Sequence, residues 1–246
     1  MLIYLVFKHR RIVKRLNCYG ITDVKMYKAR IWYIGLRRSQ STGKKIIRYF
    51  YSATYKGKPC FVKLGKNCAT FKEVLVYKHM TECGLTLMPA LLHSDENYAK
   101  NTVLLVTEFV NDMTNFKLPN DRVAFEAICT QLEYIHQQLR EADIVHGDLT
   151  TSNLSITADQ RIVVMDFGIA FSPAFEAFQS NTPFIGTHFN VSGNKCIYDN
   201  AYSFLRILDD CNISDNFKQE ECYKRLRRLV GVHTHVVNIP NEIIKE

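Results

Sequence analysis

Apolar and polar positions divide the chain into a strand-rich first part and a helix-rich second part. Residues 31–64 are rich in Tyr, Ile, Phe and Val and are interrupted by turn formers, which predicts three antiparallel strands. The two turns are expected at 39–45 and at 56–59. Apolar residues then recur at helical spacing over 71–80, and Gly84 closes the run, so a single helix should follow the third strand.

The second part begins with a continuous apolar strand at 102–110 and a connecting loop at 111–120, where two lobes should hinge. Short apolar segments at 154–156 and 162–165 predict two further strands. Each is bounded by polar residues that suit active-site loops. A later helix is expected over 201–208.

A long amphipathic helix is predicted over 122–140, with Asp121 available as its N-cap. The residues expected on its buried face are Val123, Ala127, Ile128, Leu132, Ile135 and Leu139. This helix delivers the chain to the polar loops that follow it.

The composition is that of an ordinary globular protein, since 47% of the 246 residues are hydrophobic. The 32 Lys and Arg residues exceed the 24 Asp and Glu residues and give a net charge of +8, which favours anionic partners. Basic residues gather near the start of the chain, at 8–11 and at Lys14, Arg15, Lys25, Lys28 and Arg30. A solvated face is the ordinary reading of this cluster. The functional alternative is contact with an anionic membrane surface or a nucleic-acid-associated complex.

The sequence predicts a cytoplasmic protein that is at most peripheral at a membrane. The apolar residues 1–7 lack a preceding positive charge and are too few for a secretory core, so we do not expect a signal peptide. No apolar run approaches the roughly 20 residues of a spanning helix. The eight cysteines form no C-x-x-C pair, which argues against a zinc knuckle and favours reduced thiols.

Two polar segments carry the candidate chemistry. His146-Gly147-Asp148 is followed by Asn153, and Asp166-Phe167-Gly168 comes after a short intervening hairpin. Together they resemble the catalytic loop and the metal-binding DFG loop of protein kinases. Phosphoryl transfer needs an acceptor for a hydroxyl proton and oxygen ligands for Mg²⁺. The resemblance assigns the first role to Asp148 and the second to Asn153 and Asp166.

The resemblance extends upstream to the expected ATP-binding residues. Phe61-Val62-Lys63-Leu64 is similar to the kinase V-A-I-K motif, which implies that Lys63 contacts the α- and β-phosphates and that Glu73 holds it by an ion pair. Residues 104–110 look like the strand and hinge that receive adenine on backbone groups. Thr107 then stands at the gatekeeper position, and Glu108 and Val110 belong to the hinge.

Several positions depart from the kinase pattern. Gly147 replaces the arginine of H-R-D, which makes activation-loop phosphorylation an unsuitable switch, and Thr150 replaces a lysine. No glycine-rich loop precedes the second strand, where 39–45 is the nearest substitute, and Asn200 stands where an aspartate anchors the catalytic loop. The chain after Asp209 is too short for the helices of a standard carboxyl-terminal lobe.

The resemblance implies an α+β fold of protein-kinase type with two lobes. An antiparallel N-lobe with one helix and a basic extension is expected at 1–110, and a reduced, mainly helical C-lobe at 111–246. The implied function is ATP- and Mg²⁺-dependent transfer of the γ-phosphate to a hydroxyl of a protein Ser or Thr, including autophosphorylation. Gly186-Thr187 resembles the substrate-facing loop of such serine/threonine kinases.

Three alternatives stay open. The segment His146 to Asn153 also resembles the small kinase and ATPase of the KEOPS tRNA-modification complex. The hairpin at 55–59 and the basic start resemble bacterial lipopolysaccharide-core sugar kinases, whose acceptor is a lipid-linked saccharide. A pseudokinase that binds nucleotide without turnover is the non-enzymatic alternative.

Overall fold

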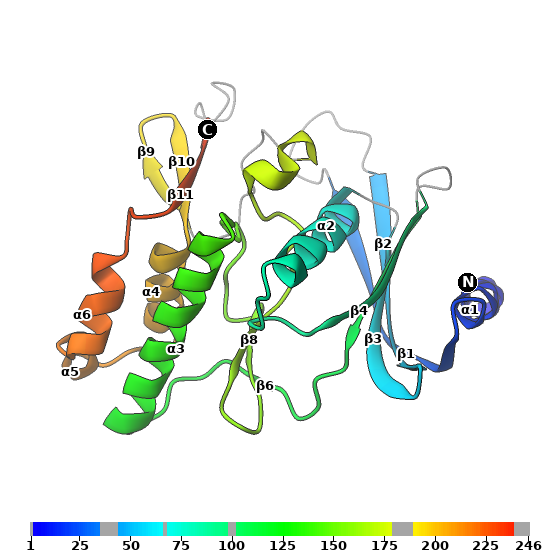
Figure 1. Ribbon diagram of the computed structural model, residues 1–246, viewed down its shortest axis with the longest axis horizontal. Coiled ribbons are helices and arrows are strands. Elements are labelled where there is room, and N and C mark those ends of the chain that lie inside the picture. Colours follow the sequence, from blue (N-terminus) through cyan, green and yellow to red (C-terminus); the bar gives the residue numbers. More distant parts are fainter. Residues whose placement is uncertain (1, 35–43, 66–67, 98–101, 179–188, 239–246) are drawn as a thin grey trace. The chain divides into compact units, whose positions relative to one another are not determined.

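The computed structural model describes residues 2–34, 44–65, 68–97, 102–178 and 189–238 (Figure 1). The chain forms two compact units. Unit 1 comprises 1–74 and 90–109, and unit 2 comprises 75–89 and 110–246. An antiparallel sheet together with several helices confirms the predicted α+β fold class.

Unit 1 is built on a five-stranded antiparallel sheet with the strand order β1-β2-β3-β5-β4. The strands are β1 (Ile21–Ile34), β2 (Lys44–Tyr55), β3 (Lys58–Gly65), β4 (Leu91–Asn97) and β5 (Thr102–Glu108). The three antiparallel strands expected within 31–64 are confirmed, but the first begins ten residues earlier, at Ile21. Ile21 is fully buried, so the core of the sheet already includes this early residue.

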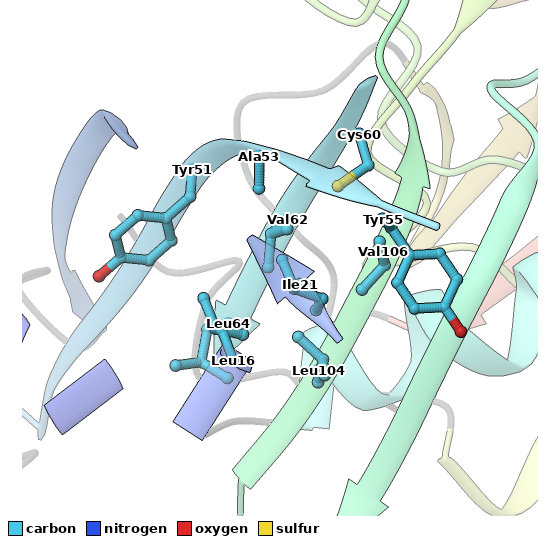
Figure 2. Close-up of a cluster of buried hydrophobic side chains, with 10 residues drawn as sticks. All are labelled: Leu16, Ile21, Tyr51, Ala53, Tyr55, Cys60, Val62, Leu64, Leu104 and Val106. Carbon is cyan, nitrogen blue, oxygen red and sulfur yellow. The ribbon is translucent and has the colours of Figure 1, made fainter. Parts of the chain in front are cut away.

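One face of this sheet carries the core of unit 1 (Figure 2). Helix α1 (Leu2–Asn17), which the sequence did not predict, packs Leu16 onto it, with Ile12 partly buried at its side. The buried cluster consists of Leu16, Ile21, Tyr51, Ala53, Tyr55, Cys60, Val62, Leu64, Leu104 and Val106. Because side chains alternate along a strand, Phe61 and Lys63 point to the opposite face.

The helices of the remaining chain are α2 (Cys68–Glu82), α3 (Arg122–Glu141), α4 (Asn200–Asp210), α5 (Asp215–Lys218) and α6 (Glu221–Arg228). They confirm the helices predicted over 71–80, 122–140 and 201–208. Asp121 caps α3 as expected, since its Oδ1 accepts a hydrogen bond from Ala124 N–H at 2.8 Å. None of the described helices combines the length and apolar character needed to cross a bilayer.

The predicted buried face of α3 is partly wrong. Val123 is 78% exposed and Ala127 is exposed, whereas Phe125 and Cys129 are buried. Both exposed residues lie two positions from Phe125, which is about 200° around the helix. Phe125 stacks on Phe217 at 4.4 Å between ring centroids and sets the direction of the buried stripe. The other four predicted residues, Ile128, Leu132, Ile135 and Leu139, are buried.

Two small antiparallel sheets complete unit 2, with strand orders β6-β7-β8 and β11-β10-β9. Their strands are β6 (Thr114–Asn115), β7 (Leu154–Ile156), β8 (Ile162–Val164), β9 (Asn190–Ser192), β10 (Lys195–Asp199) and β11 (Thr234–Asn238). A 3₁₀ helix, η2, spans Pro173–Phe178. The strands expected at 154–156 and 162–165 are therefore present, and the second sheet was not anticipated.

Residues 75–89 pack with unit 2, although the sequence places them in the first lobe. The Tyr77 ring meets the edge of Phe167 at 6.1 Å, and His79 Nε2 lies 2.9 Å from the Ala142 carbonyl oxygen. The Leu87 carbonyl also accepts a hydrogen bond from Val164 N–H at 2.9 Å. The two lobes at 1–110 and 111–246 stay a prediction, and these contacts explain why the second half of α2 groups differently.

Candidate active site

In unit 1, Lys63 on β3 forms an ion pair with Glu73 on α2. Both side chains are buried, at 5% and 4% exposure. Helix α2 starts close to the strand because Gly65 has no side chain: a Cβ there would lie 2.2 Å from Thr70 Oγ1. Burying two charges is costly unless they are paired, so the ammonium group is held in one place by its partner.

The expected hinge lies at the end of β5. Thr107 is buried and pairs across the sheet with Phe61. Glu108 N–H donates to the Ala90 carbonyl at 2.8 Å, while the Glu108 carboxylate accepts the Ala90 N–H at 3.3 Å. The Glu108 carboxylate, and not the Glu108 backbone carbonyl, thus accepts the hydrogen bond from Ala90 N–H. Val110 is partly exposed and starts the segment that belongs to unit 2.

In unit 2, hydrogen bonds close the loop that contains Asp148, residues 145–153, here called the Asp148 loop. Asn153 Nδ2 donates to the Asp148 carbonyl at 2.7 Å and to Asp148 Oδ2 at 3.1 Å. Asn153 N–H also donates to the Thr150 carbonyl at 3.0 Å. Within the described residues, both of these side-chain hydrogen bonds of Asn153 are donated by its amide nitrogen. The amide oxygen, which is an acceptor, is therefore the atom suited to a cation.

Asp166 follows β8 in a second loop, residues 165–169, here called the Asp166 loop. It adopts φ +61°, a left-handed conformation that costs free energy in a non-glycine residue and often occurs at functional sites. Met165 N–H donates to the Asn153 carbonyl at 2.9 Å and so joins the two loops. Phe167 is fully buried and anchors the Asp166 loop against the His146 ring, 4.5 Å away.

His146 is a second link between these loops, with a role that sequence reasoning missed. Asp148 N–H donates to its Nδ1 at 3.2 Å, which places the imidazole proton on Nε2, 3.0 Å from the Met165 carbonyl. Burial lowers the pKa of His146 to about 4, although the hydrogen bond to Met165 and the charge of Asp166 oppose the shift. The ring is therefore neutral at pH 7 and acts as a fixed spacer. Its signal in the sequence was only its place in the H-x-D pattern.

Asn200, at the start of α4, anchors the Asp148 loop in place of the usual aspartate. Its Oδ1 accepts a hydrogen bond from His146 N–H at 2.9 Å, and its Nδ2 donates to the Ile144 carbonyl at 2.9 Å. The side chain is almost completely buried. An amide fits this position because one donor and one acceptor are both used, which a carboxylate cannot provide.

Gly147 has a structural reason to replace arginine. Its φ is +75°, and a Cβ would lie 2.7 Å from Phe171 Cε2 and 3.0 Å from the Ile169 carbonyl oxygen. Phe171 is itself held by stacking on His235 of β11, with ring centroids 4.0 Å apart. Phe171 thus occupies the space beside Gly147, and His235 of the sheet β11-β10-β9 packs against it.

The donor set fits Mg²⁺ held together with a nucleotide. Among the described residues, no group of three or more His, Cys, Asp or Glu side chains could hold a metal by itself. Mg²⁺ is usually bound by one or two protein oxygen ligands, with phosphate oxygens and waters completing its shell. In unit 2, Asn153 and Asp166 can supply such ligands. Considered by itself in unit 1, the buried ammonium of Lys63 suits a phosphate. The loop substitute at 39–43 and Gly186-Thr187 lie outside the described residues.

Comparisons with known proteins point to kinase-like proteins. A sequence profile of the ABC1 atypical kinase-like domain matches residues 95–184. Mitogen-activated protein kinase 14 of Xenopus laevis is 35% identical over 111 residues, which cover 41% of this chain and 29% of that protein. Mitogen-activated protein kinase p38b of Drosophila melanogaster is 28% identical over 138 residues, covering 52% of this chain and 34% of that protein.

Mitogen-activated protein kinase p38a of Drosophila melanogaster is 29% identical over 140 residues, with the same shares of 52% and 34%. The chain spans about a third of the length of the curated relatives it matches. The ABC1 profile includes Asp148, Asn153 and Asp166, so the match covers the loops described above. These similarities and the α+β architecture support a protein-kinase-like superfamily for this chain.

Proposed function

We propose that the protein transfers the γ-phosphate of ATP to a hydroxyl group. The observation that carries this proposal is the pair of hydrogen bonds from the Asn153 amide to the backbone and the carboxylate of Asp148. They hold an acid–base group in fixed geometry next to an oxygen suited to a metal ion. General base catalysis depends on such positioning.

Five polar residues have roles in the proposed reaction. Lys63, held by Glu73, binds phosphate oxygens of ATP. The Asn153 amide oxygen and the Asp166 carboxylate hold Mg²⁺, which neutralises phosphate charge when it is bound. Asp148 accepts the proton of the attacking hydroxyl while the new O–P bond forms and ADP leaves.

Turnover is favoured over a nucleotide-binding pseudokinase because the Asp148 loop keeps its internal hydrogen bonds despite its sequence departures. Asn200 and His146 hold the loop without the H-R-D arginine. We therefore propose that activity does not depend on a phosphorylated activation loop, since the cation that would pair with that phosphate is missing.

The proposed acceptor is a Ser or Thr hydroxyl of a protein, including the chain itself. The similarity to proteins named as protein kinases supports this choice. Thr150, in place of a lysine, offers a neutral hydroxyl that pairs with Ser152 Oγ at 2.9 Å. Thr150 therefore places no positive charge at this position, where serine/threonine kinases carry a lysine. For this reason we keep a lipopolysaccharide-core saccharide as the second candidate acceptor. A KEOPS-like ATPase is the third candidate function.

Helix α1 is proposed to contact an anionic partner by charge alone. Ile12 and Leu16 pack on the sheet, whereas Arg10, Arg11 and Lys14 are exposed. Because Ile12 and Leu16 already pack on the sheet, these two side chains cannot enter a bilayer without leaving it. We propose peripheral attachment of a cytoplasmic protein to an anionic membrane surface. Sedimentation with anionic vesicles tests this, and sedimentation with neutral vesicles, or binding to nucleic acid alone, would contradict it.

Incubation with γ-labelled ATP and Mg²⁺ tests the proposed reaction. The protein is incubated alone, with a basic test protein and with a lipopolysaccharide fraction, in parallel with Asp166→Ala. Label on protein that is absent in Asp166→Ala supports the first acceptor, and label only on the saccharide supports the second. Asp112→Ala is a matched control because Asp112 is another left-handed aspartate, with φ +55°, outside both loops. No transfer and no ATP hydrolysis would overturn the enzymatic proposal.

A further inference from the structure

Unit 2 contains a cavity of about 370 Å³ beside the start of α3, here called the α3–α5 cavity. One wall is the segment 118–120, which leads into α3, and the other consists of residues from 211–217, which join α4 to α5. The Asp148 loop follows the opposite end of α3, and a helix of 20 residues is about 30 Å long. The cavity is therefore separate from the loops that carry the proposed chemistry.

Hydrogen bonds at helix ends fix the longer wall of the cavity. Ile213 N–H donates to the Leu208 carbonyl at 3.2 Å, which ends α4 at a left-handed residue, Asn212, with φ +60°. Ser214 then caps α5 by accepting a hydrogen bond from Phe217 N–H at 3.4 Å. A wall that is already held in place loses little freedom when a ligand binds, which favours affinity.

The lining of the cavity is neutral and combines polar with apolar groups. None of the nine described residues that line it carries a charge. Three of them, Asn120, Asn212 and Asn216, are exposed asparagines whose side chains make no hydrogen bond within the described ranges. Each of these amides can both donate and accept hydrogen bonds. The cavity thus offers several uncommitted amides to a ligand.

Phe217 adds a rigid aromatic surface to these amides. Helix α5 lies beside the first turns of α3 (Figure 1), where the Phe217 ring stacks on Phe125 with 4.4 Å between centroids and 7° between ring planes. Phe217 also lines the cavity and is partly exposed. Because Phe125 covers one face of the ring and holds it in place, the rest of the ring is available to pack against C–H groups of a ligand.

We propose that the α3–α5 cavity binds a neutral saccharide. A sugar ring carries hydroxyl groups around its rim, which donate and accept hydrogen bonds, and C–H groups on its faces, which pack on an aromatic ring. The amides and Phe217 match these two kinds of group. The cavity volume lies within the roughly 300–1,000 Å³ of small-molecule sites. This inference goes beyond the proposed function and does not depend on it.

Two other classes of ligand fit the cavity less well. Phosphate-bearing ligands are recognised by cations, and none of the described lining residues supplies one. An extended peptide gains affinity by adding main-chain hydrogen bonds to the edge of a sheet. The described residues that line the cavity lie in loops and in α5, and none of them belongs to a strand.

Titration of the full chain with the methyl glycosides of glucose, galactose and mannose, followed by NMR without nucleotide, tests the inference. We expect at least one glycoside to bind with a dissociation constant of about 1 mM and to shift the resonances of 118–120 and 211–217. Asn212→Gly removes an amide and keeps the left-handed backbone, and Asn216→Ala removes a second amide. Each should weaken binding by about tenfold.

Gln219→Ala is the matched control because it removes an exposed amide at the end of α5 that does not line the cavity. Its affinity for the glycoside should equal that of the unchanged protein. Thermal unfolding of each variant verifies that it folds.

Three results would overturn the inference. The first is that no glycoside binds at about fifty times the expected dissociation constant. The second is that Asn212→Gly and Asn216→Ala bind the glycoside as tightly as Gln219→Ala does, which would place the sugar elsewhere. The third is that a neutral tripeptide shifts the resonances of the cavity and the glycosides do not. All three leave the proposed phosphoryl transfer standing, because labelled ATP measures it through other residues.

Discussion

At the scale of single residues, Gly147 shows how packing accounts for a departure from the kinase pattern. We expect Gly147→Ala to lower the free energy of unfolding by about 2–4 kcal/mol, because strain at positive φ adds to a clash with Phe171. Gly84→Ala is the matched control: its φ is +73° and no atom lies within 4 Å of the added Cβ, so about 1 kcal/mol is expected. Urea unfolding measures both. Equal losses would show that Phe171 does not fill this space tightly.

His146 predicts a pH dependence of stability. Its pKa is about 4 in the folded protein, below the ordinary value of 6.5, so the unfolded chain binds a proton that the folded chain does not. Stability from this residue is therefore complete above pH 6.5 and is lost as the pH falls towards 4, by roughly 3 kcal/mol. Burial also lowers the pKa of His136, which adds to the slope.

Urea unfolding at pH 7, 6, 5 and 4.5 checks this prediction, with His146→Gln as the comparison. The difference in unfolding free energy between the two proteins should shrink as the pH falls. A constant difference across this range would mean that His146 is protonated equally easily in both states. His136→Gln, in α3, measures the part of the slope that His136 causes.

At the scale of elements, α4 fixes the Asp148 loop through Asn200. We expect Asn200→Asp to cost about 2–3 kcal/mol, because a carboxylate oxygen would face the Ile144 carbonyl without a proton between them. The rate of phosphoryl transfer should fall as well, since His146 and Asp148 lose their support. Ser203→Ala, in the same helix, removes the hydrogen bond from Ser203 Oγ to the Asp199 carbonyl. It should cost about 1 kcal/mol and leave the rate of phosphoryl transfer unchanged. Equal stability and activity of Asn200→Asp would contradict the anchor.

The contact between β3 and α2 predicts a coupled effect of two substitutions. Lys63→Met leaves the carboxylate of Glu73 buried without its cation and should cost about 3–5 kcal/mol. The double variant Lys63→Met/Glu73→Gln should recover much of this loss, which a double-mutant cycle of unfolding free energies measures. Additive losses would show that the ion pair contributes no coupling. ATP binding should be weakened in both variants.

Local patterns predicted part of this fold, including β2, β3, α2, α3 and α4. Richness in Tyr, Ile, Phe and Val between turn formers predicted β2 and β3, and apolar spacing with a capping aspartate predicted α3. The buried stripe of α3 was placed wrongly because Val123 is apolar, although the contact between Phe125 and Phe217 decides its direction. Helix α1 and β11 were missed, since α1 is strongly basic and β11 depends on pairing with β10, which local periodicity does not reveal.

At the scale of the whole molecule, the candidate site was visible only through resemblance. Spacing alone offered Asp148, Asn153 and Asp166 as polar residues after apolar strands, and their roles remain proposals. The buried bridge through His146 could not be predicted, because it depends on tertiary hydrogen bonds to Asp148 and Met165. Resemblance also suggested a deficit at Asn200, whereas its amide makes both anchoring bonds.

The central claim is that Asp148 accepts the proton during phosphoryl transfer. Its most direct test is the single-turnover rate of label transfer from γ-labelled ATP by Asp148→Asn, with Asp112→Asn as a control at an exposed aspartate. We expect Asp148→Asn still to bind Mg²⁺-ATP but to transfer the phosphate about 100-fold more slowly or worse, while the control keeps its rate. Full transfer by Asp148→Asn would show that Asp148 is not the proton acceptor.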